Sequence, residues 1–91
     1  MTYLNHYAKI THLVKIMKQH GIETSDICLA ASLRVYGYTL ERIEKEERRG
    51  IFVFVDVDDE IVSKYNLGQL LVEPNAFHAA VKFLTMAVKR V

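Results

Sequence analysis

The chain contains one cysteine, one proline and no hydrophobic run long enough to cross a membrane. A lone Cys28 cannot form a disulfide within the chain, so nothing indicates an oxidising compartment. A membrane helix needs roughly 20 consecutive apolar residues, and no stretch approaches that length. A content of 51% hydrophobic and 25% charged residues in 91 positions is typical of a globular chain, and we expect one domain over residues 1–91.

Recognisable reaction chemistry is also missing. No glycine-rich phosphate loop occurs, and Ser25 lacks the G-x-S-x-G context of a nucleophilic serine. Cys28 has apolar neighbours and is expected to be a small buried residue rather than a nucleophile. No two of the four histidines stand four residues apart, the spacing that lets two imidazoles on a helix share one ion. We therefore expect no enzyme, no metal site and no cofactor.

An acidic cluster at residues 56–60 has two interpretations. Its carboxylates could offer oxygen ligands to Mg²⁺ or Ca²⁺, but the glycine and the closing glutamate of a calcium loop are absent. The same cluster fits a helix start, in which Asp58 caps the helix while Asp59 and Glu60 complement its positive end. We interpret it as a cap.

The net charge of +1 hides a regional asymmetry. Residues 1–36 carry four Lys/Arg and two acids, residues 37–73 carry five and nine, and residues 74–91 carry three and none. Basic ends and an acidic middle can steer a charged partner or a second copy of the chain. The N-terminus lacks the basic region and apolar block of a signal peptide, so we expect a cytoplasmic protein with no membrane association.

Residues 51–57 form the most informative segment, because they read as a strand that is apolar on both faces. Its odd-numbered positions are aliphatic and are expected to share one face, Phe52 and Phe54 occupy the other face, and only Asp56 is polar. A half-exposed strand would place polar residues at alternate positions, so this strand must be covered on both sides. What covers the second face is the main question that the sequence raises.

The periodicity of the remaining residues predicts the other elements. They are expected at residues 4–20 (helix), 24–37 (helix), 38–45 (strand), 58–68 (short helix), 69–73 (strand) and 74–91 (helix). The predicted fold class is α+β: a small three-stranded antiparallel sheet packed with helices in the order ααββαβα. Strands 38–45 and 51–57 should form a hairpin, and a slip in phase between Leu40 and Ile43 indicates a bulge or an exposed edge. The helices at 24–37 and 74–91 are the expected cover for one face.

Several segments carry a resemblance to known proteins. They are Thr24-Ser25-Asp26-Ile27-Cys28-Leu29-Ala30-Ala31-Ser32-Leu33, Gly37-Tyr38, Phe52-Val53-Phe54, a tyrosine before a short turn, and Pro74 before a closing amphipathic helix. Over residues 24–91 the chain resembles a small uncharacterised domain family of phages and bacteria, whose name records only that its function is unknown. The resemblance implies a fold order and a mobile-element origin, and it carries over no site. Residues 1–20 would be an addition to this core.

Two functional hypotheses follow. The first is a non-enzymatic interaction module that self-associates as a dimer, because aromatic residues anchor such contacts. Its interface candidates are Tyr3, Tyr7, Tyr36, Tyr38, Phe52 and Phe54, all of which could instead belong to the core of the monomer. The family resemblance adds a host protein as a further partner.

The alternative is a small nucleic-acid-binding protein that uses a basic face of its last helix. Its candidate phosphate contacts are His78, Lys82, Lys89 and Arg90. A solvated helix face would look the same in sequence, so nucleic acid is the second hypothesis.

Overall fold

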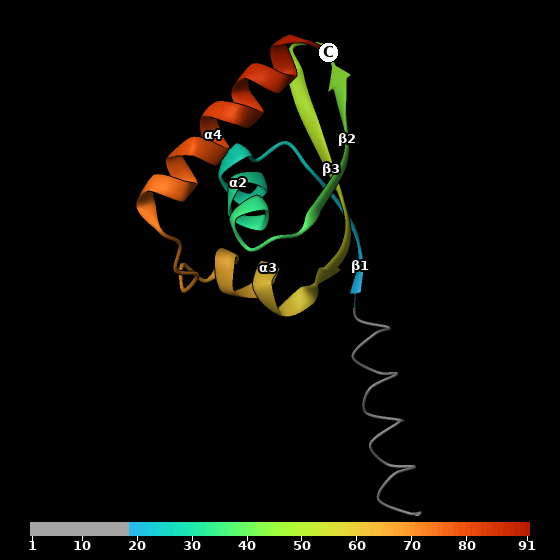
Figure 1. Cartoon of the computed structure of the whole chain (residues 1–91). Coiled ribbons are helices and arrows are strands. Elements are labelled where there is room, and N and C mark those ends of the chain that lie inside the picture. The colour runs from blue at the N-terminus through green and yellow to red at the C-terminus, as the bar shows by residue number, and fades with distance from the viewer. Residues whose placement is uncertain (1–18) are drawn as a thin grey trace, which may run out of the picture.

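The computed structural model describes residues 19–91, in which three helices pack with a three-stranded sheet (Figure 1). The elements are β1 (Gln19–Thr24), α2 (Ile27–Val35), β2 (Thr39–Glu46), β3 (Arg49–Asp58), α3 (Asp59–Asn66) and α4 (Pro74–Lys89). The strand order is β1-β3-β2, and both pairs are antiparallel. The predicted α+β class with an antiparallel three-stranded sheet is therefore confirmed, and the doubly apolar strand is central.

The identity of the third strand is a correction. Residues 69–73, predicted to be a strand, form an irregular connection between α3 and α4, and the third strand is β1. Both edges of β3 are already occupied, by β1 and by β2, so residues 69–73 have no place beside the apolar strand. They bridge the end of one helix to the start of the next instead.

The predicted first helix lies mostly outside the described residues. Its last two positions, Gln19 and His20, belong to β1, so the expected helical end at His20 and Gly21 is wrong. The Cβ that a larger residue would carry at position 21 would lie 3.4 Å from the carbonyl oxygen of Phe54, which places this glycine against the central strand.

The core lies between the sheet and the helices. Figure 1 shows α2 and α4 on one side of the sheet, as predicted, with α3 at one end. The fully buried side chains with the largest volumes are Phe52, Phe54, Leu33, Leu84 and Val57. They come from β3, α2 and α4, so the packing of α2 and α4 against the phenylalanine face of β3 provides most of the hydrophobic stabilisation.

A bulge in β2 explains why its apolar residues Leu40 and Ile43 break the regular alternation of a strand. Leu40 pairs with Phe54 and Ile43 pairs with Phe52, so one extra residue, Glu41, stands between them in β2. A bulge of this kind rotates the following side chains to the other face. Leu40 and Ile43 consequently pack on the same core although they are three residues apart.

A second irregularity turns the end of β3. The pairing with β1 shifts between His20 and Ile22, where Asp56 on β3 adopts a left-handed φ of 54°. Beyond this point Val57 is fully buried with the phenylalanines. The expectation that Val57 shares the face of Ile51 is therefore wrong, because the bulge reverses the alternation.

The opposite face of the sheet has a different cover. Within residues 19–91 no helix lies over this face, yet Val53 is only 6% exposed. Its direct neighbours are Glu23 on β1 and Arg42 on β2, whose long side chains can cover aliphatic surface with their stems. Arg42 pairs with Glu44 at 3.0 Å, and this hydrogen bond raises the pKa of the Arg42 guanidinium. Within residues 19–91, the residues that pair with Val53 are therefore charged, while Ile51 and Val55 on either side of it are only partly buried.

Candidate functional site

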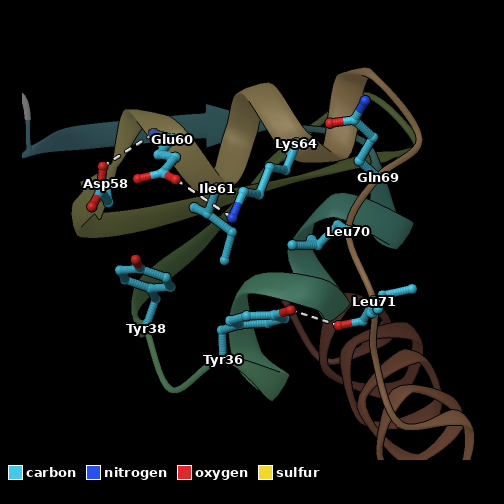
Figure 2. Close-up of a pocket in the computed structure, with 9 residues that line it drawn as sticks. All are labelled: Tyr36, Tyr38, Asp58, Glu60, Ile61, Lys64, Gln69, Leu70 and Leu71. Atoms are coloured by element: carbon cyan, nitrogen blue, oxygen red, sulfur yellow. Dashed lines mark hydrogen bonds and ion pairs between the residues drawn. The ribbon is translucent and has the colours of Figure 1, made fainter.

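A hollow of about 340 Å³ lies beside α3 (Figure 2). Its lining comes from the end of α2, the end of β3, α3 and the connection to α4. The residues that line it, called here the α3 hollow, are Tyr36, Tyr38, Asp58, Glu60, Ile61, Lys64, Gln69, Leu70 and Leu71.

The end of α2 places the two tyrosines. The amide of Gly37 donates to the carbonyl of Arg34, and the amide of Tyr38 donates to the carbonyl of Leu33, each at 3.0 Å. These two bonds form a Schellman motif, and Gly37 supplies the left-handed residue it requires, with φ 91°. The reversal of the chain leaves Tyr36 and Tyr38 on the same side of the hollow (Figure 2).

The Tyr36 ring is held in place by a hydrogen bond from its hydroxyl group. Its hydroxyl donates to the carbonyl oxygen of Leu71 at 2.6 Å, so the ring spans from α2 to the connection between α3 and α4. Tyr36 remains 47% exposed and Leu71 84% exposed. The hollow therefore has an aromatic and aliphatic wall that solvent reaches.

The acidic wall belongs to the start of α3. Asp58 is the N-cap of α3, and its Oδ1 accepts a hydrogen bond from the amide of Glu60 at 3.0 Å, which confirms the predicted cap. The ammonium of Lys64 lies 3.4 Å from Oε1 of Glu60, with both side chains largely exposed. In Figure 2 this ammonium points toward Glu60 above the two tyrosine rings.

α3 ends in the same way as α2. The amide of Gly68 donates to the carbonyl of Tyr65 at 3.0 Å, and the amide of Gln69 donates to that of Lys64 at 2.8 Å. Gly68 has φ 70°, so this is a second Schellman motif. It directs Gln69 and the leucines that follow it along the rim of the hollow.

A second candidate surface lies on α4. The core-facing side of this helix carries Phe77, Ala80, Val81, Leu84 and Val88. A second apolar row, called here the outer α4 seam, consists of Ala76, Ala79, Phe83 and Met86, and all four are exposed. Phe83 is 50% and Met86 is 54% exposed, which are large fractions for such side chains.

The seam adjoins a groove between α2 and α4. The groove has a volume of about 400 Å³ and is lined by Arg34, Val35, Ala76, Ala79, Ala80 and Phe83. The guanidinium carbon of Arg34 lies 4.4 Å from the centroid of the Phe83 ring, which is a cation–π contact. The same surface thus presents a projecting aromatic side chain and a recess floored by small residues.

The predicted basic residues lie together on α4. His78, Lys82 and Lys89 are exposed and separated by four and seven residues, so they lie along one side of the helix. Arg90 is the C-cap residue and is also exposed. The structure therefore brings these four side chains to the same helix and leaves them accessible.

The predicted aromatic interface residues separate into three groups. Tyr3 and Tyr7 lie outside the described residues. Tyr38 is half-buried against the core, while Phe52 and Phe54, at 2% and 0% exposure, belong to the core itself. Of the six candidates, Tyr36 alone is exposed within residues 19–91.

The sequence reasoning did not select Phe83 and Met86. Their signal is the spacing of three, four and three residues along Ala76, Ala79, Phe83 and Met86, which is the spacing of a coiled-coil seam. The outer α4 seam lies beside the core-facing row of the same helix. In the sequence, the two rows are therefore easily taken for one broad apolar face.

Cys28 and His20 both lie at the surface of the domain. Cys28 is exposed at the start of α2, so the expectation that it is buried is wrong. It stands on the first turn of α2, before the buried residues Leu29 to Leu33 begin. His20 lies in β1, where its Nδ1 is 3.1 Å from Oδ1 of Asp59.

Within residues 19–91, no group of three or more His, Cys, Asp or Glu side chains is arranged to hold a metal ion. None of the helices in this range has the length and apolar character that a membrane crossing requires.

Comparisons with known proteins agree with the fold boundaries. No curated protein and no solved structure matches the chain. A family model described as a domain of unknown function, DUF5659, matches residues 19–88, which run from the first residue of β1 to the last turn of α4. The match confirms the resemblance to an uncharacterised domain family over residues 24–88 and extends it to include β1. The chain belongs to this family of domains of unknown function.

Proposed function

We propose that this domain is a non-catalytic interaction module that self-associates through the outer α4 seam. The observation that supports the proposal is the second apolar row of α4, with Phe83 and Met86 about half exposed although the helix already covers the core with its first row. A helix that is apolar on two sides is expected to have a partner on the second side.

The shape of the seam favours a second copy of the same chain as this partner. Small residues, Ala76 and Ala79, occupy its first half, and large ones, Phe83 and Met86, occupy its second half. In an antiparallel two-fold pairing, Ala76 faces Met86 and Ala79 faces Phe83 of the other copy. Each large side chain then enters a recess floored by alanine, which is the self-complementarity that an isologous interface requires.

The size of the outer α4 seam indicates how strongly two copies of the chain should associate. The seam spans about 15 Å of helix, or three turns, and α2 adds the Arg34 side of the groove. Such a contact falls below the roughly 800 Å² per partner of a standard stable interface, so the dimer is expected to be weak and dependent on concentration.

Light scattering of the full chain provides the test. Between about 10 and 500 μM, we expect the mass to rise from that of a 10.5 kDa monomer toward twice that value. A mass that stays at 10.5 kDa over this range would overturn the proposal.

A matched pair of variants separates the seam from the rest of the helix. Phe83→Glu places a charge in the seam and is expected to keep the chain monomeric at every concentration. Thr85→Glu makes the same change in charge on the basic side of α4 and is expected to retain self-association. Because both positions are exposed, neither change should disturb the core. Unchanged self-association of Phe83→Glu would exclude the seam.

A second candidate function is nucleic-acid binding by the basic side of α4. The supporting observation is that His78, Lys82 and Lys89 lie along one exposed side of a helix that carries no acidic residue from Pro74 to Lys89. Contacts to successive phosphates require such an arrangement. In a gel shift at low salt, Lys82→Glu combined with Lys89→Glu should abolish binding. Binding that is unaltered, or absent from the unmodified chain, would count against this function.

A further inference from the structure

We infer that the α3 hollow is a binding site for an organic cation, such as the guanidinium of an arginine or the ammonium of a lysine on a partner. This inference is independent of self-association, because the hollow and the outer α4 seam share no residue. Three properties of the hollow carry it.

The first property is its aromatic wall. Tyr36 and Tyr38 stand on the same side of the hollow (Figure 2), and the Tyr36 ring is held by its hydrogen bond to Leu71. Ordered tyrosine faces attract cations through the negative charge of their π-systems. Because the ring is already fixed, a ligand would not have to order it on binding.

The second property is the acidic wall opposite these rings. Asp58 and Glu60 line the hollow, whereas Asp59, between them in sequence, does not line it and pairs with His20. The capping hydrogen bond engages Oδ1 of Asp58, so within residues 19–91 its Oδ2 is left to face a ligand. Two carboxylates and two tyrosines around a recess of about 340 Å³ suit a planar guanidinium or an alkylammonium group.

The third property is that an ammonium group already lies in the hollow. Lys64 places its Nζ 3.4 Å from Glu60, and about half of the Lys64 side chain is exposed. An exposed pair of this kind contributes little stability, so an incoming cation can displace Lys64 at small cost. Lys64 therefore acts as an internal competitor for the site, and its removal should strengthen binding.

The experiment is a titration followed by nuclear magnetic resonance of the full chain carrying Phe83→Glu, which keeps self-association from affecting the result. Methylguanidinium chloride is added, with sodium chloride at the same ionic strength as the reference. We expect saturable shifts of the amides of Tyr36, Glu60, Lys64 and Leu70. Shifts equal to those with sodium chloride would overturn the inference.

Variants of the acidic wall test the chemistry of the site. Asp58→Asn with Glu60→Gln keeps a residue that can cap α3 and should weaken methylguanidinium binding about ten-fold. Lys64→Ala should strengthen it about two- to five-fold, whereas Lys82→Ala on α4 should leave it unchanged. An affinity that is the same in all four proteins would also overturn the inference.

The aromatic wall and the source of the cation are tested separately. Tyr36→Phe keeps the aromatic face but loses the hydrogen bond that fixes the ring, so it should weaken binding less than Tyr36→Leu, which should weaken it about two- to five-fold. A short peptide with one arginine, compared with methylguanidinium, distinguishes the sources. Tighter binding of the peptide would identify the side chain of a partner protein as the ligand, and equal binding would identify a free small cation.

Discussion

The hydroxyl of Tyr65 donates a hydrogen bond to Oδ2 of Asp26 at 2.6 Å, and this bond joins α3 to the N-cap of α2. The other carboxylate oxygen of Asp26 accepts from the amides of Cys28, at 2.9 Å, and Leu29, at 3.3 Å. One carboxylate thus caps α2 and also holds the helix that forms the acidic wall of the α3 hollow.

Removal of the Tyr65 hydroxyl should lower stability while the cap persists. Tyr65→Phe is expected to reduce the free energy of unfolding by about 0.5–1.5 kcal/mol, the usual net contribution of one hydrogen bond. Urea denaturation followed by circular dichroism measures the difference. A loss equal to that of Asp26→Ala, which also removes the cap, would show that the two roles of Asp26 cannot be separated.

The same bond predicts a loss of stability at alkaline pH. Burial, together with the bond to Asp26, raises the pKa of Tyr65 to about 12 from an ordinary value of 10.0. The folded chain therefore holds this proton more tightly than the unfolded chain. The contribution is fully present below pH 10 and is lost as the pH rises toward 12. Denaturation at a series of pH values should show this decline in the free energy of unfolding. The Tyr65→Phe variant has no hydroxyl to titrate, so its free energy of unfolding should decline less over the same pH range.

The N-cap of α3 offers a prediction with a built-in control. Asp58→Ala should cost about 1 kcal/mol of unfolding free energy, because the amide of Glu60 loses its acceptor. Asp58→Asn keeps an oxygen acceptor and should cost much less. Equal losses in thermal or urea denaturation would mean that the charge, rather than the hydrogen bond, supplies the stability.

The close approach of α4 to the β2–β3 hairpin explains why position 50 is a glycine. A Cβ at position 50 would lie 2.5 Å from Cγ2 of Val88, closer than two carbon atoms can pack. Because the χ1 angle of valine is restricted in a helix, we expect Gly50→Ala to destabilise the fold by about 1–3 kcal/mol. Val88→Ala should recover part of this loss in the double variant. No recovery would show that backbone strain, rather than the methyl contact, causes the effect.

Salt separates the two proposed functions of α4. Lys82 stands on one side of the outer α4 seam and Arg34 on the other, so a symmetric dimer brings like charges together. Screening of this repulsion should strengthen self-association as salt rises from about 0.05 to 0.5 M. Nucleic-acid binding should weaken over the same range. Light scattering and gel shifts at each salt concentration measure the two trends.

Much of the fold was predictable because local chemistry encodes it. The cap of α3 at Asp58, the end of α2 at Gly37 and the beginning of α4 at Pro74 are all predictable from the sequence. Each acts within one turn of its own position, so neighbouring residues are enough to identify it. The phase slip between Leu40 and Ile43 was visible for the same reason, and the bulge at Glu41 accounts for it.

Pairing between strands that are far apart in the sequence accounts for the secondary-structure predictions that were wrong. His20 and Gly21 look like a helix end, and they become part of a strand because the free edge of β3 lies beside them. Residues 69–73 have the composition of a strand, but both edges of the apolar strand are already taken. The edge available to a segment depends on the rest of the sheet.

For this protein, the sequence by itself determined the α+β class, the central apolar strand, the helix caps and the basic side of α4. Only the tertiary structure decided which strand completes the sheet, which residues flank Val53 on the second face of β3, and where Tyr36 lies relative to Glu60. The physical reason is the distance along the sequence over which each feature is determined. Helix caps and hydrophobic periodicity depend on residues within a few positions of one another. The α3 hollow joins residues 36 and 71, and their approach depends on how α2, α3 and the sheet pack together.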